Sequence, residues 1–368
     1  MLAMSPGPRT VIATGPQGSV AMTSATFTFA GTDNLTPASS LLFAWQLDGA
    51  AFGAFSSTTP ATFNGLASGP HTFALKARDQ AGNESAMVSR SFTVSGLQVT
   101  ITSPTTGTTV PTGTLLVQGT LDTGGLDVGV AVNGTVAAVQ AGRFAVQVPV
   151  ATDTHVLTAT LTTATGATTS HSVVVSASAS PSTAPTLRPL PAAGAAPLTV
   201  RFSLGGITPS SLTLDVDGDG RPDFTGTSLQ EQTFTYTQPG LYLPVATVQD
   251  AQGARFTVTA VVLVESPIVV TARFQNLWNN FKAKLVAGDI PAALGHLSPA
   301  IRPQFNQVFP ALGQNLPGVA ASLEKLAVVE NLDDLAEAAI MRREGSTPFL
   351  YFIYFRRDSL GRWLIEEM

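Results

Sequence analysis

Short runs in which apolar and polar residues alternate recur from residue 10 to residue 264, separated by clusters of turn-forming residues. Alternation with a period of two places one face of a strand in a core and the other in water. Residues 26–29, 43–47 and 71–77 are examples. Short strands at this spacing are typical of antiparallel β-sandwiches joined in tandem. From residue 268 the pattern changes, and apolar residues recur at helical spacing.

The composition excludes several classes of function. The 368 residues include no cysteine, which excludes disulfides, thiolate catalysis and cysteine-ligated zinc or iron–sulfur centres. The formal net charge of −5 argues against binding to nucleic acid. No apolar run reaches the roughly 20 residues that a membrane-spanning helix needs. Residues 1–18 lack the apolar segment of a signal peptide.

Two Ig-like sandwiches are predicted for residues 1–96 and 97–177. Residues 43–49 and 69–83 (GPHTFALKARDQAGN) resemble bacterial Ig-like repeats of extracellular proteins, and Trp45 is expected to point inward. In the second module, residues 99–104 and the hairpin 130–136 resemble Ig-like modules found beside glycan-active and adhesive domains. Five prolines in residues 178–197 predict an extended Pro/Ala/Ser linker.

Residues 198–265 are predicted to form a third sandwich. Four sequence motifs follow one another in this segment: PLTVRF, the acidic turn at residues 215–220, FTYTQPGLY and VQDAQG. Together they resemble a PKD (polycystic kidney disease) domain. The resemblance implies a β-sandwich spacer or binding module that is mostly extracellular.

The acidic turn DVDGDGRPD, residues 215–223, is a candidate metal site. It matches the start of a calcium loop, with carboxylates at positions one, three, five and nine, glycine at six and a backbone carbonyl at seven. Position twelve is Gly226, so the closing glutamate is missing. Mutual repulsion of the carboxylates favours a cation, whereas a hydrogen-bonded turn without an ion is the alternative. The predicted calcium ligands are Asp215, Asp217, Asp219, Arg221 and Asp223.

Residues 266–368 are predicted to form an α+β domain. A long helix ends near Gly288, Asp289 caps a short helix, and a further helix starts at Ser298-Pro299. A fourth helix near residues 319–326 precedes strands at 326–329, 335–343, 347–357 and 363–366. This order, with "GDIPAAL" and the closing "FRRDSLGRWLIEEM", resembles the NTF2-like (SnoaL-like, cone-shaped) fold. Helices are therefore expected on one face of an antiparallel meander.

Several residues of this last domain are candidates for ligand binding. A cone-shaped pocket can use a histidine or a carboxylate as a general base, and tyrosine hydroxyls can reach a buried site. The strand 349–355 is apolar on both faces, so one face needs a second cover, by a partner subunit or a ligand. Four arginines on neighbouring strands, at 342, 343, 356 and 357, form either a basic patch or a solvated face. The candidate ligand-binding residues are Asp289, His296, Tyr351 and Tyr354.

These observations predict a non-enzymatic modular protein of the bacterial cell surface or exterior. Three sandwiches would form a rod for adhesion or for presentation of the NTF2-like domain, which binds a ligand or forms a homodimer. Protein or glycan surfaces are the expected partners, and calcium is the expected cofactor. One alternative is a carbohydrate- or protein-binding accessory region of a larger exported enzyme. The other is a small-ligand-binding or catalytic NTF2-like domain.

Overall fold

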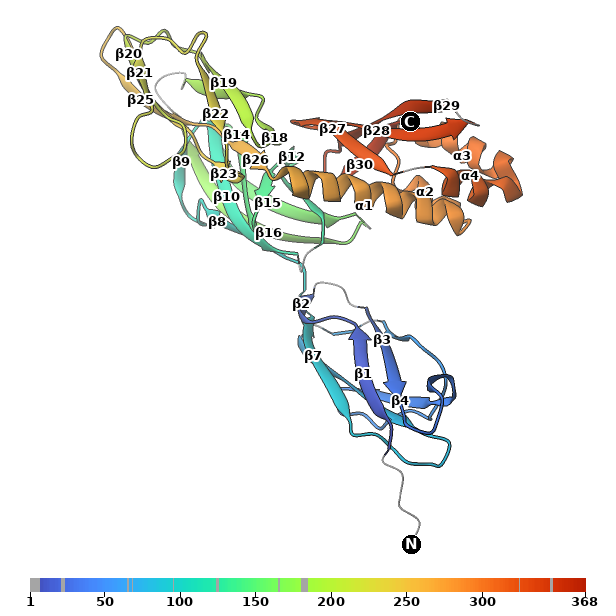
Figure 1. Cartoon of the computed structure of the whole chain (residues 1–368). Coiled ribbons are helices and arrows are strands. Elements are labelled where there is room, and N and C mark those ends of the chain that lie inside the picture. The colour runs from blue at the N-terminus through green and yellow to red at the C-terminus, as the bar shows by residue number, and fades with distance from the viewer. Residues whose placement is uncertain are drawn as a thin grey trace. The chain divides into compact units, whose positions relative to one another are not determined.

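The computed structural model divides the chain into two units (Figure 1). Residues 1–98 and 122–126 form the first unit, and residues 99–121 and 127–368 form the second. The structure describes residues 7–20, 24–64, 66–67, 69–94, 96–123, 126–164, 166–179, 185–323, 325–344 and 347–368. The side chains of residues 19, 342–344, 347 and 348 lie outside this description.

The first unit is a β-sandwich built on phenylalanines. Its sheets have the orders β1-β3-β5 and β2-β7-β6-β4. Phe27 and Phe73, both fully buried, stack with ring centroids 4.0 Å apart. Trp45 is partly buried against this core. The elements are β1 (Arg9–Thr14), β2 (Gly18–Val20), β3 (Ala25–Thr32), η1 (Ala38–Ser40), β4 (Leu42–Leu47), β5 (Ala61–Phe63), β6 (Gly69–Arg78) and β7 (Val88–Val94).

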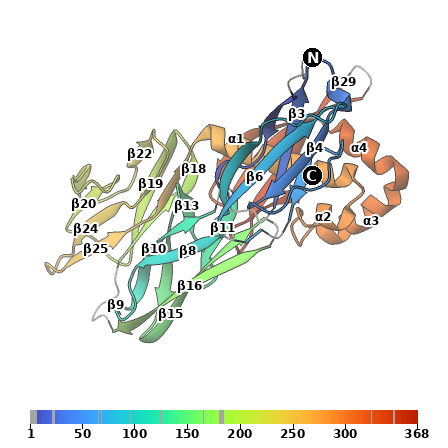
Figure 2. The same ribbon diagram turned by 90° about the horizontal axis from the view of Figure 1, so that it is seen from below.

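The second sandwich opens the second unit. Sheets β13-β14-β10-β8 and β12-β11-β15-β16-β9 enclose buried Val117, Phe144 and Leu157, and Figure 2 shows both sets of strands. The Asn133-Gly134 hairpin forms as predicted, with positive φ at both residues. The strands are β8 (Gln98–Ser103), β9 (Thr109–Pro111), β10 (Gly113–Asp122), β11 (Val128–Val132), β12 (Thr135–Val136), β13 (Ala138–Gln140), β14 (Arg143–Val150), β15 (Asp153–Thr163) and β16 (Thr168–Ser178).

The third module includes residues that the sequence assigned to a linker. Sheets β17-β19-β22 and β21-β20-β24-β25 enclose Val200, Leu214 and Val248. Two strands, β17 and β18, lie inside residues 178–197, so the prediction of an extended linker is wrong for residues 186–190 and 193–195. Their backbone groups pair with β19, β26 and β27. The strands are β17 (Thr186–Leu190), β18 (Ala193–Ala195), β19 (Leu198–Gly205), β20 (Ser211–Asp215), β21 (Phe224–Gly226), β22 (Thr233–Tyr236), β23 (Gly240–Tyr242), β24 (Val245–Gln249), β25 (Arg255–Thr259) and β26 (Val262–Glu265).

The C-terminal domain has the predicted α+β order. Figure 2 shows α2, α3 and α4 gathered at one end of the domain, and α1 packs on β27. The buried face of α1 carries Phe274, Trp278 and Phe281, which meet Phe355 and Ile353 of the sheet. The elements are α1 (Pro267–Val286), α2 (Ile290–Leu294), α3 (Arg302–Leu312), η2 (Gly313–Asn315), α4 (Leu316–Ser322), β27 (Leu326–Leu332), β28 (Leu335–Glu344), β29 (Thr347–Arg357) and β30 (Trp363–Glu367).

One helix start differs from the prediction. The helix expected at Ser298-Pro299 begins at Arg302, with Pro303 in its first turn. The backbone N–H of Ser298 donates instead to the carbonyl of Ile365 on β30, at 2.8 Å. Ser298 directly follows the isolated bridge between Leu297 and Ile365, and its carbonyl accepts from Arg302 N at 3.1 Å, where the helix begins.

Candidate functional site

A pocket of about 260 Å³ opens in the C-terminal domain, between its helices and its sheet. Helices α1, α3 and α4 supply most of its wall, because their apolar positions recur on one face of each helix. Strands β28 and β29, together with Leu323 and Met368, supply the rest. The lining residues are Trp278, Phe281, Leu285, Phe305, Val308, Phe309, Leu312, Leu316, Val319, Ala320, Leu323, Ile340, Tyr351, Ile353 and Met368.

The pocket is apolar throughout. Apart from the Tyr351 hydroxyl and the Trp278 indole N–H, the lining side chains carry no polar hydrogen-bonding group. The rim is open to solvent, since Val308 and Val319 are 39% exposed and Tyr351 is 40% exposed. Such a cavity can exclude water from an apolar group. Among the described residues that line the pocket, none has a carboxylate, histidine or lysine side chain.

Asp289 and His296, two of the predicted site residues, lie outside the pocket lining. The Asp289 carboxylate caps α2 by accepting from Ala292 N at 3.2 Å, as predicted, and lies 3.9 Å from Lys284 Nζ. His296 Nδ1 lies 3.0 Å from the Ala292 carbonyl oxygen, and the ring is partly buried near Phe281. The structure therefore does not bring these two residues together with Tyr351.

Tyr354 and Tyr351 are on opposite faces of β29, because side chains of a strand alternate. Tyr351 faces the helices, in the same row as buried Ile353. Tyr354 is partly buried on the outer face. On that face Leu350 and Phe352 are 60% and 45% exposed. The second apolar face predicted from the sequence is thus present, and its cover by a partner subunit stays a prediction.

The predicted basic patch is not formed by the arginines whose side chains are described. Arg356 lies 3.9 Å from a carboxylate oxygen of Glu366. The Arg357 guanidinium lies over the ring of Trp363, 4.8 Å from its centroid, and burial lowers the pKa of Arg357. The side chains of Arg342 and Arg343 lie outside the described residues.

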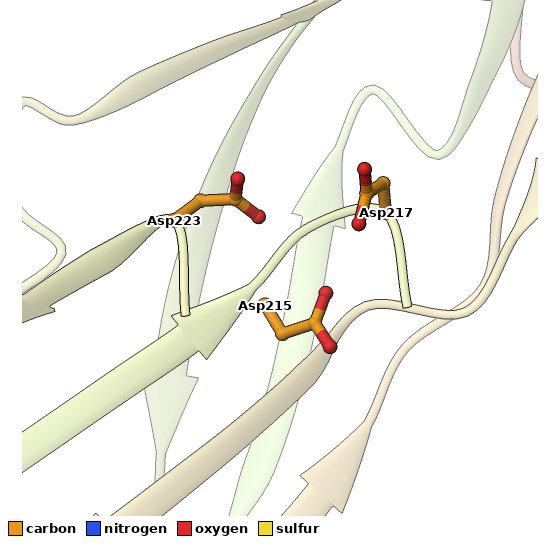
Figure 3. A group of neighbouring side chains, drawn as sticks. All are labelled: Asp215, Asp217 and Asp223. Carbon is orange, nitrogen blue, oxygen red and sulfur yellow. The ribbon is translucent and has the colours of Figure 1, made fainter. Parts of the chain in front are cut away.

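The acidic turn of the third module brings three of its predicted ligands together (Figure 3). Asp215 ends β20, and Asp223 directly precedes β21 on the neighbouring strand. One carboxylate oxygen from each of Asp215, Asp217 and Asp223 lies within 4.8 Å of the others, and Figure 3 shows these groups facing a shared space. Oxygen donors of this kind suit a hard cation such as Ca²⁺.

Backbone N–H groups hold these carboxylates in place. Both oxygens of Asp215 accept, from Gly218 N at 2.7 Å and Gly220 N at 2.8 Å. Asp223 Oδ2 accepts from Val216 N at 2.7 Å. Asp217 Oδ1 accepts from Asp219 N at 3.1 Å. Such bonds fix the turn with or without an ion.

Asp219 does not belong to the group of three. Its Oδ1 accepts from Arg221 N at 2.7 Å, within the exposed tip of the turn. The predicted role of the Arg221 carbonyl as a ligand stays a prediction. The prediction placed Asp219 among the ligands because the calcium-loop pattern assumes that the whole loop closes around the ion. In the structure, Asp219 instead stabilises the tip of the turn.

A tyrosine that the sequence did not single out supports the acidic turn. Tyr236 is 6% exposed, and its hydroxyl donates to the Val216 carbonyl at 2.8 Å. Burial raises the pKa of Tyr236, and the nearby Tyr242 and the three aspartates raise it further. The sequence indicated only that Tyr236 lies in a strand, through the alternation of polar and aromatic residues at 233–236.

An ionic cluster within the second unit, with Glu265 buried, Arg273 partly buried and Asp127 exposed, was also missed. Glu265, 2% exposed, accepts from Arg273 Nη2 at 2.6 Å and from Asn331 Nδ2 at 3.2 Å. Arg273 Nε lies 3.4 Å from Asp127 Oδ1. Burial acts to lower the pKa of Arg273, and these carboxylates outweigh it and raise the pKa. In the sequence, the one indication of this cluster was Glu265, a single charged residue in the apolar run VVLVES.

None of the known families has a model that matches this sequence, and no curated protein matches it. Among solved structures, it is similar to three N-terminal domains of the Highly Immunogenic Outer Capsid protein of bacteriophage RB49. The two are 11% identical over 72% of this chain and 99% of that chain, with a TM-score of 0.30.

Two further similar structures are also made of tandem modules. The I9–I11 tandem of titin is 11% identical over 70% of this chain and 100% of that chain, with a TM-score of 0.28. The fibronectin(III)-like modules of Clostridium thermocellum CbhA are 15% identical over 46% of this chain and 95% of theirs, with a TM-score of 0.23. Scores this low carry no argument about what the chain does.

Proposed function

We propose that this chain is a modular binding protein without catalytic activity, whose C-terminal domain holds an apolar ligand. The observation that carries the proposal is the apolar pocket between α1, α3, α4 and the sheet. Pockets that bind small molecules are mostly apolar and concave. Asp289, a candidate ligand-binding residue, caps a helix, and His296, another candidate, makes a local backbone contact.

The size of the pocket limits the affinity. A ligand that buries about 250 Å² of apolar surface gains roughly 6 kcal/mol from that burial. The cost of ordering the ligand reduces this figure. We therefore expect weak binding, with a dissociation constant of tens of micromolar or higher, of a compact apolar group or a short apolar chain.

Fluorescence of the neutral apolar probe N-phenyl-1-naphthylamine tests the pocket in the full chain. We expect saturable binding, and we expect Val319→Trp at the rim to weaken it about tenfold by obstructing the mouth. Val329→Trp is the matched control, since Val329 is 58% exposed on β27 and does not line the pocket. Absence of saturable binding, or equal effects of the two substitutions, would overturn the proposal.

We also propose that the protein acts at the cell surface or outside the cell. Charged residues make up 12% of the sequence, about half the usual share, which suits an exposed outer surface. Within the part of the chain that is described, no helix has the length and apolarity to cross a membrane. Protease treatment of intact cells, followed by immunodetection, tests the location. Full protection of the protein would contradict it.

A structural calcium ion in the third module is a second proposal, supported by the grouping of Asp215, Asp217 and Asp223. We expect millimolar Ca²⁺ to raise the temperature of the unfolding transition that includes the third module, and EDTA to reverse the rise. Asp217→Asn should abolish the effect, because it removes one of the three charges. Asp219→Asn, which changes charge outside the group, should retain most of it. An unfolding temperature unaffected by Ca²⁺ in the unsubstituted chain would refute the site.

A further inference from the structure

His71, near the start of β6, joins two segments at one end of the first sandwich. Its Nδ1 lies 2.7 Å from Asp48 Oδ2, in the turn after β4. Its Nε2 lies 2.7 Å from the carbonyl oxygen of Ala67, in the segment before β6. The residue is 9% exposed, and its ring stacks on Phe92 of β7. Water therefore has little access with which to replace either contact.

Both partners of the ring accept hydrogen bonds and neither can donate one near neutral pH. A backbone carbonyl has no proton, and an ionised carboxylate is acceptor-only. A neutral imidazole carries one N–H, so it can satisfy one of the two contacts and turns a lone pair toward the other. Only the imidazolium, with an N–H at each nitrogen, satisfies both. The geometry thus requires a protonated ring.

We propose that His71 is a proton-dependent clasp that holds the segment before β6 to the turn at Asp48. When the ring loses its proton, the remaining N–H stays on Nδ1, because the charged Asp48 carboxylate is the stronger acceptor. The contact with the Ala67 carbonyl then becomes repulsive and opens. Asp48 stays in place, since its Oδ1 also accepts from Thr72 N at 2.8 Å.

The ionisable surroundings of the ring agree with this assignment. Among the described residues, Asp48 is the one ionisable group that contacts the ring. On the β7 side, the ring contacts Phe92. Arg90, two residues away on the same face of that strand, donates to the carbonyls of Ile12 and Gly15. The hydrogen bond to Ala67 raises the pKa of His71, and the bond to Asp48 raises it further.

The pH window follows from the two partners. Because the folded pKa of His71 is raised above its ordinary 6.5, its stabilisation is complete below that value and is lost as pH rises through the folded pKa. Burial acts to raise the pKa of Asp48, and the bonds from His71 and Thr72 outweigh it and lower the pKa. Asp48 therefore keeps its charge at and above its ordinary 3.8. The clasp is closed between these values and opens as pH rises through the raised pKa of His71.

Two measurements on the full chain test the clasp. The C2–H resonance of His71, assigned by its loss in His71→Gln, should titrate above the ordinary histidine range. Hydrogen exchange, corrected for the intrinsic pH dependence, should show Leu66 and Ala67 losing protection by about threefold or more between pH 6 and pH 8.5. His71→Asn keeps a donor near Nδ1 and cannot titrate, so its protection should be low at both pH values.

His155→Gln is the matched control. His155 Nε2 also contacts a carbonyl four residues earlier, at Ala151, and at the same 2.7 Å. Its side chain has no carboxylate contact among the described residues, so this substitution should leave the pH dependence of Leu66 and Ala67 unchanged. The proposal is overturned if His71 titrates at or below its ordinary value. It is also overturned if the unsubstituted chain and His71→Asn show the same protection at pH 6.

Discussion

At the scale of single residues, Tyr236 connects the core of the third module to its acidic turn. Tyr236→Phe removes the hydroxyl that donates to the Val216 carbonyl and leaves that carbonyl without this partner. We expect the free energy of the unfolding transition that includes the third module to fall by about 1 kcal/mol, measured by urea denaturation. Tyr242→Phe is the control, because the Tyr242 hydroxyl bonds the exposed Gln238 carbonyl, which water can satisfy. An equal loss in both variants would contradict the supporting role.

The acidic turn shows which contacts between residues can be predicted from a sequence and which cannot. Asp215, Asp217 and Asp223 were predictable as a group because their spacing within one turn brings them close. The contribution of Tyr236 was not, because it depends on packing between strands 20 residues apart. The same holds for Asn331 and Glu265, which are 66 residues apart. Local spacing predicts local geometry, and long-range polar contacts need the tertiary structure.

At the scale of elements, the helices and strands of the C-terminal domain were predictable from the spacing of apolar residues, from helix caps and from turn residues. Asp289 caps α2 as expected, and the four strands β27 to β30 begin within one residue of the predicted starts. Strands β17 and β18 were missed because residues 178–197 are rich in proline and alanine, a composition that favours a connector. Pro189 is accommodated because β17 is an edge strand, where a missing N–H costs no ladder bond.

The candidate ligand-binding residues were predicted only in part at the same scale, since Tyr351 lines the pocket and Asp289, His296 and Tyr354 do not. The spacing of apolar residues predicts that His296 lies near a short helix and that Tyr351 lies on an apolar strand, and the structure has both. Which of them faces the pocket depends on how helices and sheet pack, and that packing has no local signal. The pocket itself is built from apolar helix faces whose residues the sequence assigned to an ordinary core.

At the scale of the whole molecule, the third module and the C-terminal domain share a sheet. Its order is β23-β26-β18-β27-β28-β29-β30, with β18 between the two parts. The sequence predicted separate modules here, because charge and period change near residue 268. A shared sheet means that the backbone of one part satisfies the backbone of the other. We therefore expect the two parts to unfold together.

Asp333 is the residue that tests this coupling. Its Oδ1 accepts from Ala192 N at 2.6 Å and Ala193 N at 2.9 Å, beside the single bridge between Gly194 and Leu332. Its φ of +53° favours glycine or asparagine as replacements. Asp333→Gly should therefore keep the turn but lose both bonds, at a cost of about 2 kcal/mol in unfolding free energy. Asp333→Asn keeps an acceptor and should lose less.

Calorimetry of the full chain, together with hydrogen exchange of β18 and β27, measures the effect. In Asp333→Gly we expect the transition shared by the third module and the C-terminal domain to split or broaden, and the N–H groups of Ala192 and Ala193 to exchange faster. Asp334→Gly, at the exposed neighbouring position, controls for the change in charge and for the added glycine. If Asp334→Gly splits the transition equally, the shared sheet does not depend on Asp333. If the unsubstituted chain already unfolds in separate steps, β18 joins the two parts without making them cooperative.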